Sequence, residues 1–251
     1  MLEEYLQLKQ NTYEVRFREE DRSYARLTLE NLLQAAGSLG EYLGIEKPAG
    51  LRAVIAPDRK EYEKLVVKWL GVDIEIPSNP GRIAQPQRKD LVFLSPRAYR
   101  EQSTFEYHPE EYERLIFHEV THVLEELLSP GIEFIPRWWS EGLAVYLSGH
   151  WRYSDQFNFR QPVVQGIREG KIPTFLEVAR RVDLSYEWGW TMVMFIERTR
   201  GREVIPTIIR ECSDGNILEL LKISEEEFSR EWQEWLLGAG KEIIIRVEYF
   251  D

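Results

Sequence analysis

The sequence has one cysteine, Cys212, and only four histidines among its 251 residues. A single cysteine cannot form a disulfide within the chain, and it also excludes a metal site built from several thiolates. Because histidine is scarce, two histidines in one short segment would be an unusual concentration of imidazole.

Basic residues are in deficit, with 32 lysines and arginines against 43 aspartates and glutamates and a formal net charge of −11. Nucleic acids and anionic membranes are bound by basic surfaces, so we expect neither partner. No stretch approaches the roughly 18 consecutive apolar residues of a membrane span. The first residues show no signal-peptide pattern, so a cytoplasmic location is the default expectation.

Apolar residues make up 43% of the chain and aromatic residues 12%, which is enough to bury a substantial core. Strand patterns come early and helix patterns late, which indicates an α+β fold in one domain of two lobes. We predict a small mixed sheet with helices in the N-terminal lobe, residues 1–129, and a mostly helical C-terminal lobe, residues 130–251. The predicted strands are residues 13–18, 51–56, 91–94 and 242–250. The predicted helices are residues 21–43, 58–71, 109–128, 136–149, 188–199 and 224–238. Residues 77–90 are predicted as a long loop.

The segment from His118 to His122 reads His-Glu-Val-Thr-His and lies in the middle of a predicted helix. Residues four apart share one face of a helix, so both imidazoles can reach the same ion. Neutral imidazole suits Zn²⁺, and Glu119 beside the first histidine can point at a metal-bound water. The flanking residues are apolar, and burying these three polar side chains among them would be costly without a partner such as an ion.

A catalytic zinc needs a third protein ligand and one open position. The next predicted helix begins near Pro136 and carries Glu141, with 18 residues between His122 and Glu141. That separation is long enough for a helix end, a loop and a return, and the small residues Gly142 and Ala144 would allow the helices to approach closely. Glu141 is the candidate third ligand. The alternative is an acidic residue that the helix dipole stabilises near the start of its helix.

This pattern, His-Glu-x-x-His followed after eighteen residues by Glu-Gly, resembles the gluzincin metallopeptidases in the spacing of the aminopeptidase N family. Residues 139–146, Trp-Ser-Glu-Gly-Leu-Ala-Val-Tyr, are similar to the Trp-x-Asn-Glu-Gly-x-Ala segment of these families, with Ser140 in place of the usual asparagine. A looser resemblance to the short bacterial and archaeal peptidase MA-like proteins extends over residues 13–240.

The resemblance implies a zincin-like fold, with residues 1–251 as a single catalytic domain and an active-site cleft between the two lobes. It implies one Zn²⁺ per chain, held by His118, His122 and Glu141. The implied activity is that of a zinc-dependent metallopeptidase, which hydrolyses peptide or protein substrates through a zinc-bound water with Glu119 as general base.

Two departures from these families stand out. The aminopeptidase N family binds the free amine of its substrate with Gly-x-Met-Glu-Asn on an edge strand, and the comparable region here is Leu91–Leu94, which argues against a dedicated aminopeptidase. Thermolysin-like enzymes carry an aspartate four residues after the glutamate ligand, where this chain has Val145. Another residue or a backbone carbonyl must then orient the ligand histidine.

The tetrahedral oxyanion needs a hydrogen-bond donor besides zinc, and gluzincins use a tyrosine or histidine on a later helix. Tyr186 lies where MA-like proteins have Tyr-x-x-Gly at the start of a helix, so the resemblance implies a catalytic role for Tyr186. The alternative is a tyrosine that lines the cleft or the core. His150 and Tyr146 compete for the same role.

Two other functions are compatible with these residues. One is a gluzincin-fold protein whose zinc site is structural or vestigial and which acts as a binding module. The other is a hydrolase of a non-peptide substrate, since fold and site do not determine the substrate. The intact Glu119 speaks against a purely structural site, because the ligands alone would suffice for structure.

Overall fold

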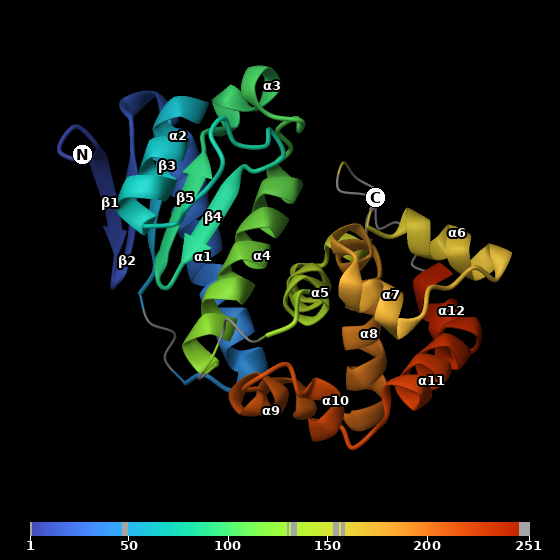
Figure 1. Cartoon of the computed structure of the whole chain (residues 1–251). Coiled ribbons are helices and arrows are strands. Elements are labelled where there is room, and N and C mark those ends of the chain that lie inside the picture. Colours follow the sequence, from blue (N-terminus) through green and yellow to red (C-terminus); the bar gives the residue numbers. More distant parts are fainter. Residues whose placement is uncertain are drawn as a thin grey trace. The chain divides into compact units, whose positions relative to one another are not determined.

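The protein is described by a computed structural model, which covers residues 2–46, 50–129, 131, 135–152, 156 and 159–245. It separates into two compact units, Met1–Leu124 and Glu125–Asp251. The first contains a sheet with helices and the second is mostly helical, so the α+β class predicted from the sequence is confirmed (Figure 1). The boundary falls inside helix α4 (Pro109–Leu128), whose last turn belongs to the second unit.

The first unit is built on a five-stranded mixed sheet in the order β1-β2-β3-β5-β4. The three inner strands run parallel, and each outer strand is antiparallel to its neighbour. Inner parallel strands are buried on both faces, which explains the continuous apolar runs Ala53–Ala56 and Leu91–Leu94. The strands are β1 (Leu6–Gln10), β2 (Tyr13–Phe17), β3 (Arg52–Ala56), β4 (Ala84–Gln87) and β5 (Asp90–Leu94).

The first unit's helices begin and end at local sequence signals. The long helix α1 packs against β2 and ends at Gly44, whose φ of 68° is the left-handed conformation that glycine adopts without strain. The Asp58 carboxylate caps α2 by accepting from the Glu61 amide at 2.9 Å. The helical segments of this part are η1 (Glu19–Asp21), α1 (Arg22–Leu43), α2 (Arg59–Leu65), a π-helical turn η2 (Val66–Leu70), η3 (Pro96–Ala98), α3 (Tyr99–Gln102) and α4.

In the second unit, the helices pack around α8, which runs from Val182 to Arg200. Every residue from Trp188 to Ile196 is buried, and α5, α7 and α11 pack against this helix. The helix predicted over residues 188–199 is therefore present, and much of it lies in the core of this unit. The helices are α5 (Arg137–Ser148), η5 (His150–Arg152), α6 (Gln161–Glu169), α7 (Phe175–Arg180), α8, α9 (Val204–Glu211), α10 (Ile217–Leu220), α11 (Glu225–Leu237) and α12 (Ala239–Ile245).

The prediction of a continuous loop over residues 77–90 was wrong, because β4 lies within it. β4 pairs with β5 from Ala84↔Phe93 to Gln87↔Asp90, and it is the outermost strand on that side of the sheet. Pro86 is tolerated there, since the edge of a sheet can spare an N–H. The edge strand is therefore not Leu91–Leu94, although Ala84–Gln87 has no carboxylate either.

Two more predictions differ from the structure, and one strand, β1, was not predicted. Helix α8 begins at Val182, six residues earlier than expected, so Tyr186 lies inside the helix. Residues 242–245 are helical instead of extended, and residues 246–250 of that predicted strand lie outside the described residues. Arg160 stabilises the end of this helix, because its guanidinium donates to the last carbonyls of α12, those of Ile244 at 2.9 Å and Ile245 at 3.2 Å.

A membrane span was not expected from the sequence. Among the helices that the structure describes, none has the length and apolar character needed to cross a membrane.

Candidate metal centre

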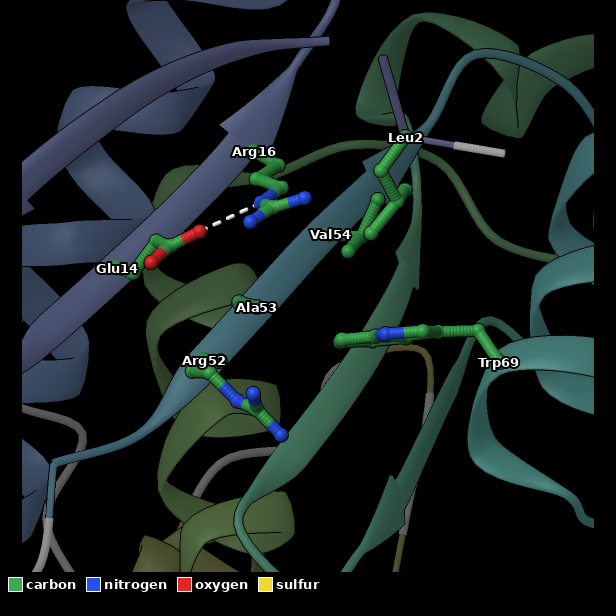
Figure 2. A pocket seen from close by; sticks show the side chains of 7 residues that line it. All are labelled: Leu2, Glu14, Arg16, Arg52, Ala53, Val54 and Trp69. Carbon is green, nitrogen blue, oxygen red and sulfur yellow. Dashed lines mark hydrogen bonds and ion pairs between the residues drawn. The ribbon is translucent and has the colours of Figure 1, made fainter.

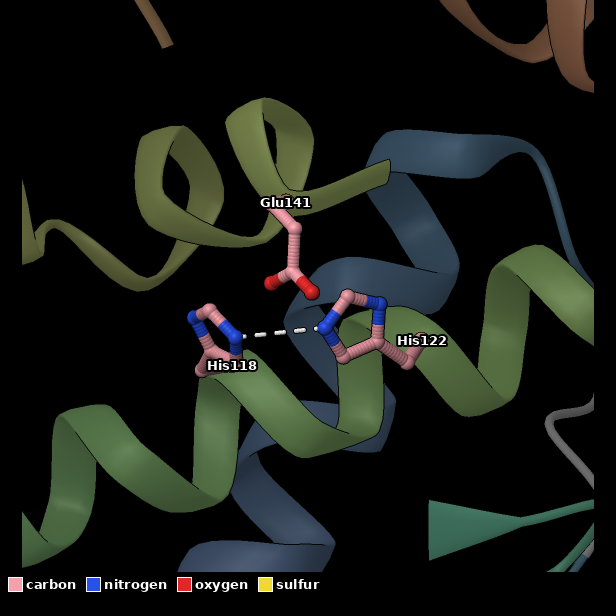
Figure 3. A group of neighbouring side chains, drawn as sticks. All are labelled: His118, His122 and Glu141. Atoms are coloured by element: carbon pink, nitrogen blue, oxygen red, sulfur yellow. Dashed lines mark hydrogen bonds between the residues drawn. The ribbon is translucent and has the colours of Figure 1, made fainter. Parts of the chain in front are cut away.

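His118 and His122 lie one turn apart on the same side of α4 (Figure 3). Their Nε2 atoms are 3.2 Å apart, and the ring centroids are separated by 4.8 Å. His118 is buried and His122 is half-buried. The two imidazoles thus converge on one point, as the four-residue spacing predicts.

Glu141 on α5 completes a group with the two histidines. One ligand atom from each of the three residues can be chosen so that all lie within 4.8 Å of one another. Figure 3 shows the carboxylate directed at the two imidazoles. Two imidazole nitrogens and a carboxylate oxygen are a donor set that zinc accepts. The structure therefore brings the three predicted ligands into one group that could hold a metal ion.

The tryptophans before Glu141 anchor the start of α5. The Trp138 ring packs against Phe175 at 5.4 Å and against Phe228 at 6.3 Å between centroids. Trp139 is completely buried. These two side chains fix the first turn of α5, and so they fix the direction in which Glu141 leaves the helix.

Glu119 follows the first histidine on α4 and is only 8% exposed. Two buried phenols lie within electrostatic reach of its carboxylate. Burial raises the pKa of Tyr62 well above its usual range, and the negative charge of Glu119 raises it further. Burial likewise raises the pKa of Tyr99, with a smaller contribution from Glu119. Both phenols are therefore neutral, and no motif in the sequence indicates that they would lie near Glu119.

Glu125 was not predicted as a residue of the site, and it is fully buried on α4. Its Oε2 accepts a hydrogen bond of 2.5 Å from the Ser140 hydroxyl. Ser140 directly precedes Glu141, and Glu125 lies three residues after His122, so this bond joins the helix of the histidines to the helix of the third ligand. A carboxylate three residues after His122 shares its helix face, which is the signal that could have identified Glu125.

Replacement of Ser140 by alanine should lower the free energy of unfolding by about 1–3 kcal/mol, because it removes this hydrogen bond from the buried Glu125 carboxyl group. Urea unfolding measures this loss. Ser38→Ala is the control, since the Ser38 hydroxyl bonds only within the exposed surface of α1, and a change of less than about 0.5 kcal/mol is expected there. Equal losses in the two variants would contradict the role assigned to the Ser140–Glu125 bond.

Tyr186 lies on α8, and its hydroxyl donates to Oε1 of Glu141 at 2.6 Å. Its ring stacks on Phe159, with centroids 6.4 Å apart and an interplanar angle of 16°. The residue predicted as oxyanion donor is therefore bound to the predicted third ligand, a contact that the sequence did not indicate.

The residues that compete with Tyr186 have partners elsewhere. The Tyr146 hydroxyl donates to Glu197, and burial together with this carboxylate raises the pKa of Tyr146. His150 is 1% exposed, and its Nδ1 lies 2.8 Å from the Ser148 hydroxyl. Cys212 is buried, which raises the pKa of its thiol and is typical of an unreactive cysteine.

A small pocket on the sheet of the first unit contains none of these residues. Figure 2 shows the indole of Trp69 across from two arginines, Arg16 and Arg52. Both guanidinium groups are neutralised, because Arg16 pairs with Glu14 at 2.5 Å and Arg52 pairs with Asp90 at 2.6 Å. The pocket therefore offers no unpaired arginine to a ligand.

No protein-family model matches the chain, and no curated protein matches its sequence. The gluzincin resemblance therefore depends on the motif residues themselves and on the His118–His122–Glu141 group that they form.

Proposed function

We propose that the protein is a zinc-dependent metallopeptidase of the gluzincin type, with His118, His122 and Glu141 as the ligands of one zinc ion per chain. The observation that supports this most is the convergence of these three side chains, with Glu119 adjacent to the first of them. A structural site would need a fourth protein ligand, whereas a catalytic site has three and an open position.

A bound zinc ion would polarise the scissile carbonyl and lower the pKa of a water molecule. Glu119 would take a proton from the attacking water and would later deliver it to the leaving amine. The low exposure of Glu119 restricts competing solvent around its carboxylate. His118, His122 and Glu141 would hold the ion through two imidazole nitrogens and a carboxylate oxygen.

Tyr186 is the proposed donor to the tetrahedral oxyanion. A phenol has one proton to donate. The Tyr186 hydroxyl must therefore break its hydrogen bond to Glu141 before it can donate one to the oxyanion. Tyr186→Phe should lower the turnover number on the order of a hundredfold, equivalent to about 3 kcal/mol, with KM little changed because the bond is absent in the ground state. Steady-state kinetics at saturating zinc measure this. An unchanged turnover number would mean that Tyr186 takes no part in the chemical step.

The function is tested by metal content together with cleavage of an unfolded protein such as casein. We expect about one Zn²⁺ per chain, cleavage that stops on treatment with a chelator, and recovery when zinc is added back. Zinc binding without cleavage of any peptide would favour the binding module or a hydrolase of a non-peptide substrate.

A further inference from the structure

Helices α5 and α8 cross with their backbones in contact at two glycines. A Cβ atom placed on Gly142 would lie 2.4 Å from the carbonyl carbon of Gly189. A Cβ atom placed on Gly189 would lie 2.3 Å from the carbonyl oxygen of Trp138. Cβ atoms do not approach backbone this closely, so any larger residue at either position would push the two helices apart.

Each glycine lies beside a residue of the metal centre. Gly142 directly follows Glu141, and Gly189 lies three residues after Tyr186. Residues three apart share a face of a helix, so Tyr186 and Gly189 both face α5. The close crossing of the helices is what brings the Tyr186 hydroxyl within 2.6 Å of Glu141 Oε1.

The Tyr186 ring is held in place by its neighbours. Phe159 stacks on it and also packs against the His150 ring, with centroids 5.7 Å apart. The Phe159 carbonyl accepts a hydrogen bond of 3.4 Å from the Trp190 indole, which belongs to the same helix as Tyr186. The Tyr186 ring is therefore packed against its neighbours in the position from which its hydroxyl reaches Oε1 of Glu141.

We propose that Tyr186 is a positioning residue for Glu141. Its hydroxyl holds the carboxylate through Oε1 at 2.6 Å, and Gly142 and Gly189 set the helix spacing at which this contact forms. A glutamate side chain that is already held loses less rotamer entropy when it binds an ion. The proposal depends on the proposed function only in taking His118, His122 and Glu141 as metal ligands.

Tyr186→Phe removes the hydroxyl and keeps the stacked ring. We expect the affinity for Zn²⁺ to fall about 10- to 100-fold, the usual effect of losing a partner that orients a ligand. Competition with a chromogenic chelator measures the affinity. We also expect the visible absorption bands of the Co²⁺-loaded variant to differ from those of the wild type, because the geometry of the carboxylate changes.

Tyr146→Phe is a matched control. It also removes the hydroxyl of a half-buried tyrosine that donates to a glutamate, and its bond to Glu197 joins the same two helices. Neither Tyr146 nor Glu197 belongs to the group that could hold a metal. Tyr146→Phe should lower the melting temperature about as much as Tyr186→Phe, while its Zn²⁺ affinity and Co²⁺ spectrum stay those of the wild type.

Unchanged Zn²⁺ affinity in Tyr186→Phe, or an equal loss in Tyr146→Phe, would overturn the proposal. Gly189→Ala should also weaken zinc binding, and a wild-type affinity in that variant would contradict the role of the glycines. If Gly189→Ala does not fold, Tyr186→Phe still decides the role of the tyrosine. A wild-type protein that binds zinc but cleaves no peptide would contradict the peptidase and leave the affinity test valid. A wild-type protein that binds no zinc would contradict both.

Discussion

Replacement of Glu119 by glutamine is expected to abolish most hydrolysis while the protein keeps its metal and its fold. Glutamine has nearly the same shape as glutamate, so it fits the buried position of Glu119. Its amide cannot accept a proton from water, and the loss of a general base typically costs about 10²- to 10⁴-fold in rate. Glu119 is not among the residues of the metal group, so about one Zn²⁺ per chain should remain.

The measurements are the turnover number, the zinc content and the melting temperature of the same preparation. Glu110→Gln is the control, because it makes the same chemical change at an exposed position in the first turn of α4. Its turnover number should match that of the wild type. Normal turnover in Glu119→Gln would exclude Glu119 as the base. Loss of zinc together with loss of turnover would instead indicate that Glu119 supports the ligands.

Replacement of His122 by alanine is expected to remove the metal. The variant loses one of three protein ligands. Its Zn²⁺ affinity should therefore fall by more than the 10- to 100-fold that is typical when only a residue that orients a ligand is lost. Glu141→Ala should have the same consequence, because its carboxylate belongs to the same group. Elemental analysis after dialysis against a weak chelator measures the retained zinc.

His108→Ala is the control for loss of an imidazole, since His108 is exposed just before α4 begins. This variant should retain wild-type zinc. Full zinc occupancy in both His122→Ala and Glu141→Ala would mean that these residues do not hold the ion, and the proposed function would fail with the ligand assignment.

Local patterns predicted the parts of this protein that depend on neighbouring residues. The helix around His118 and His122 follows from the apolar spacing and from Pro109 at its first turn, and that periodicity alone directs both imidazoles to one side. The strands β2, β3 and β5 were recognised by alternation or by short apolar runs. The helix predicted over residues 224–238 is α11, which Ser224 caps with a hydroxyl that accepts from the Glu227 amide at 3.2 Å.

Elements whose stability depends on a distant partner were missed. β4 is polar and contains Pro86, so its strand character comes from pairing with β5 and not from its own side chains. β1 likewise depends on its pairing with β2. The end of the chain that was expected to be a strand is helical as far as Ile245, where Arg160 bonds the last carbonyls.

For the metal centre, the sequence by itself determined the histidine pair and the adjacent Glu119, because their spacing depends on one helix. It offered Glu141 as the candidate third ligand through the 18-residue separation from His122 and the family resemblance. Only the tertiary structure decided that Tyr186 bonds Glu141 and that Glu125 bonds Ser140. These contacts join residues of different helices, and they depend on how closely those helices pack. At the crossing of α5 and α8, that distance is set by the absence of side chains on Gly142 and Gly189, whose mutual contact no periodicity in the sequence encodes.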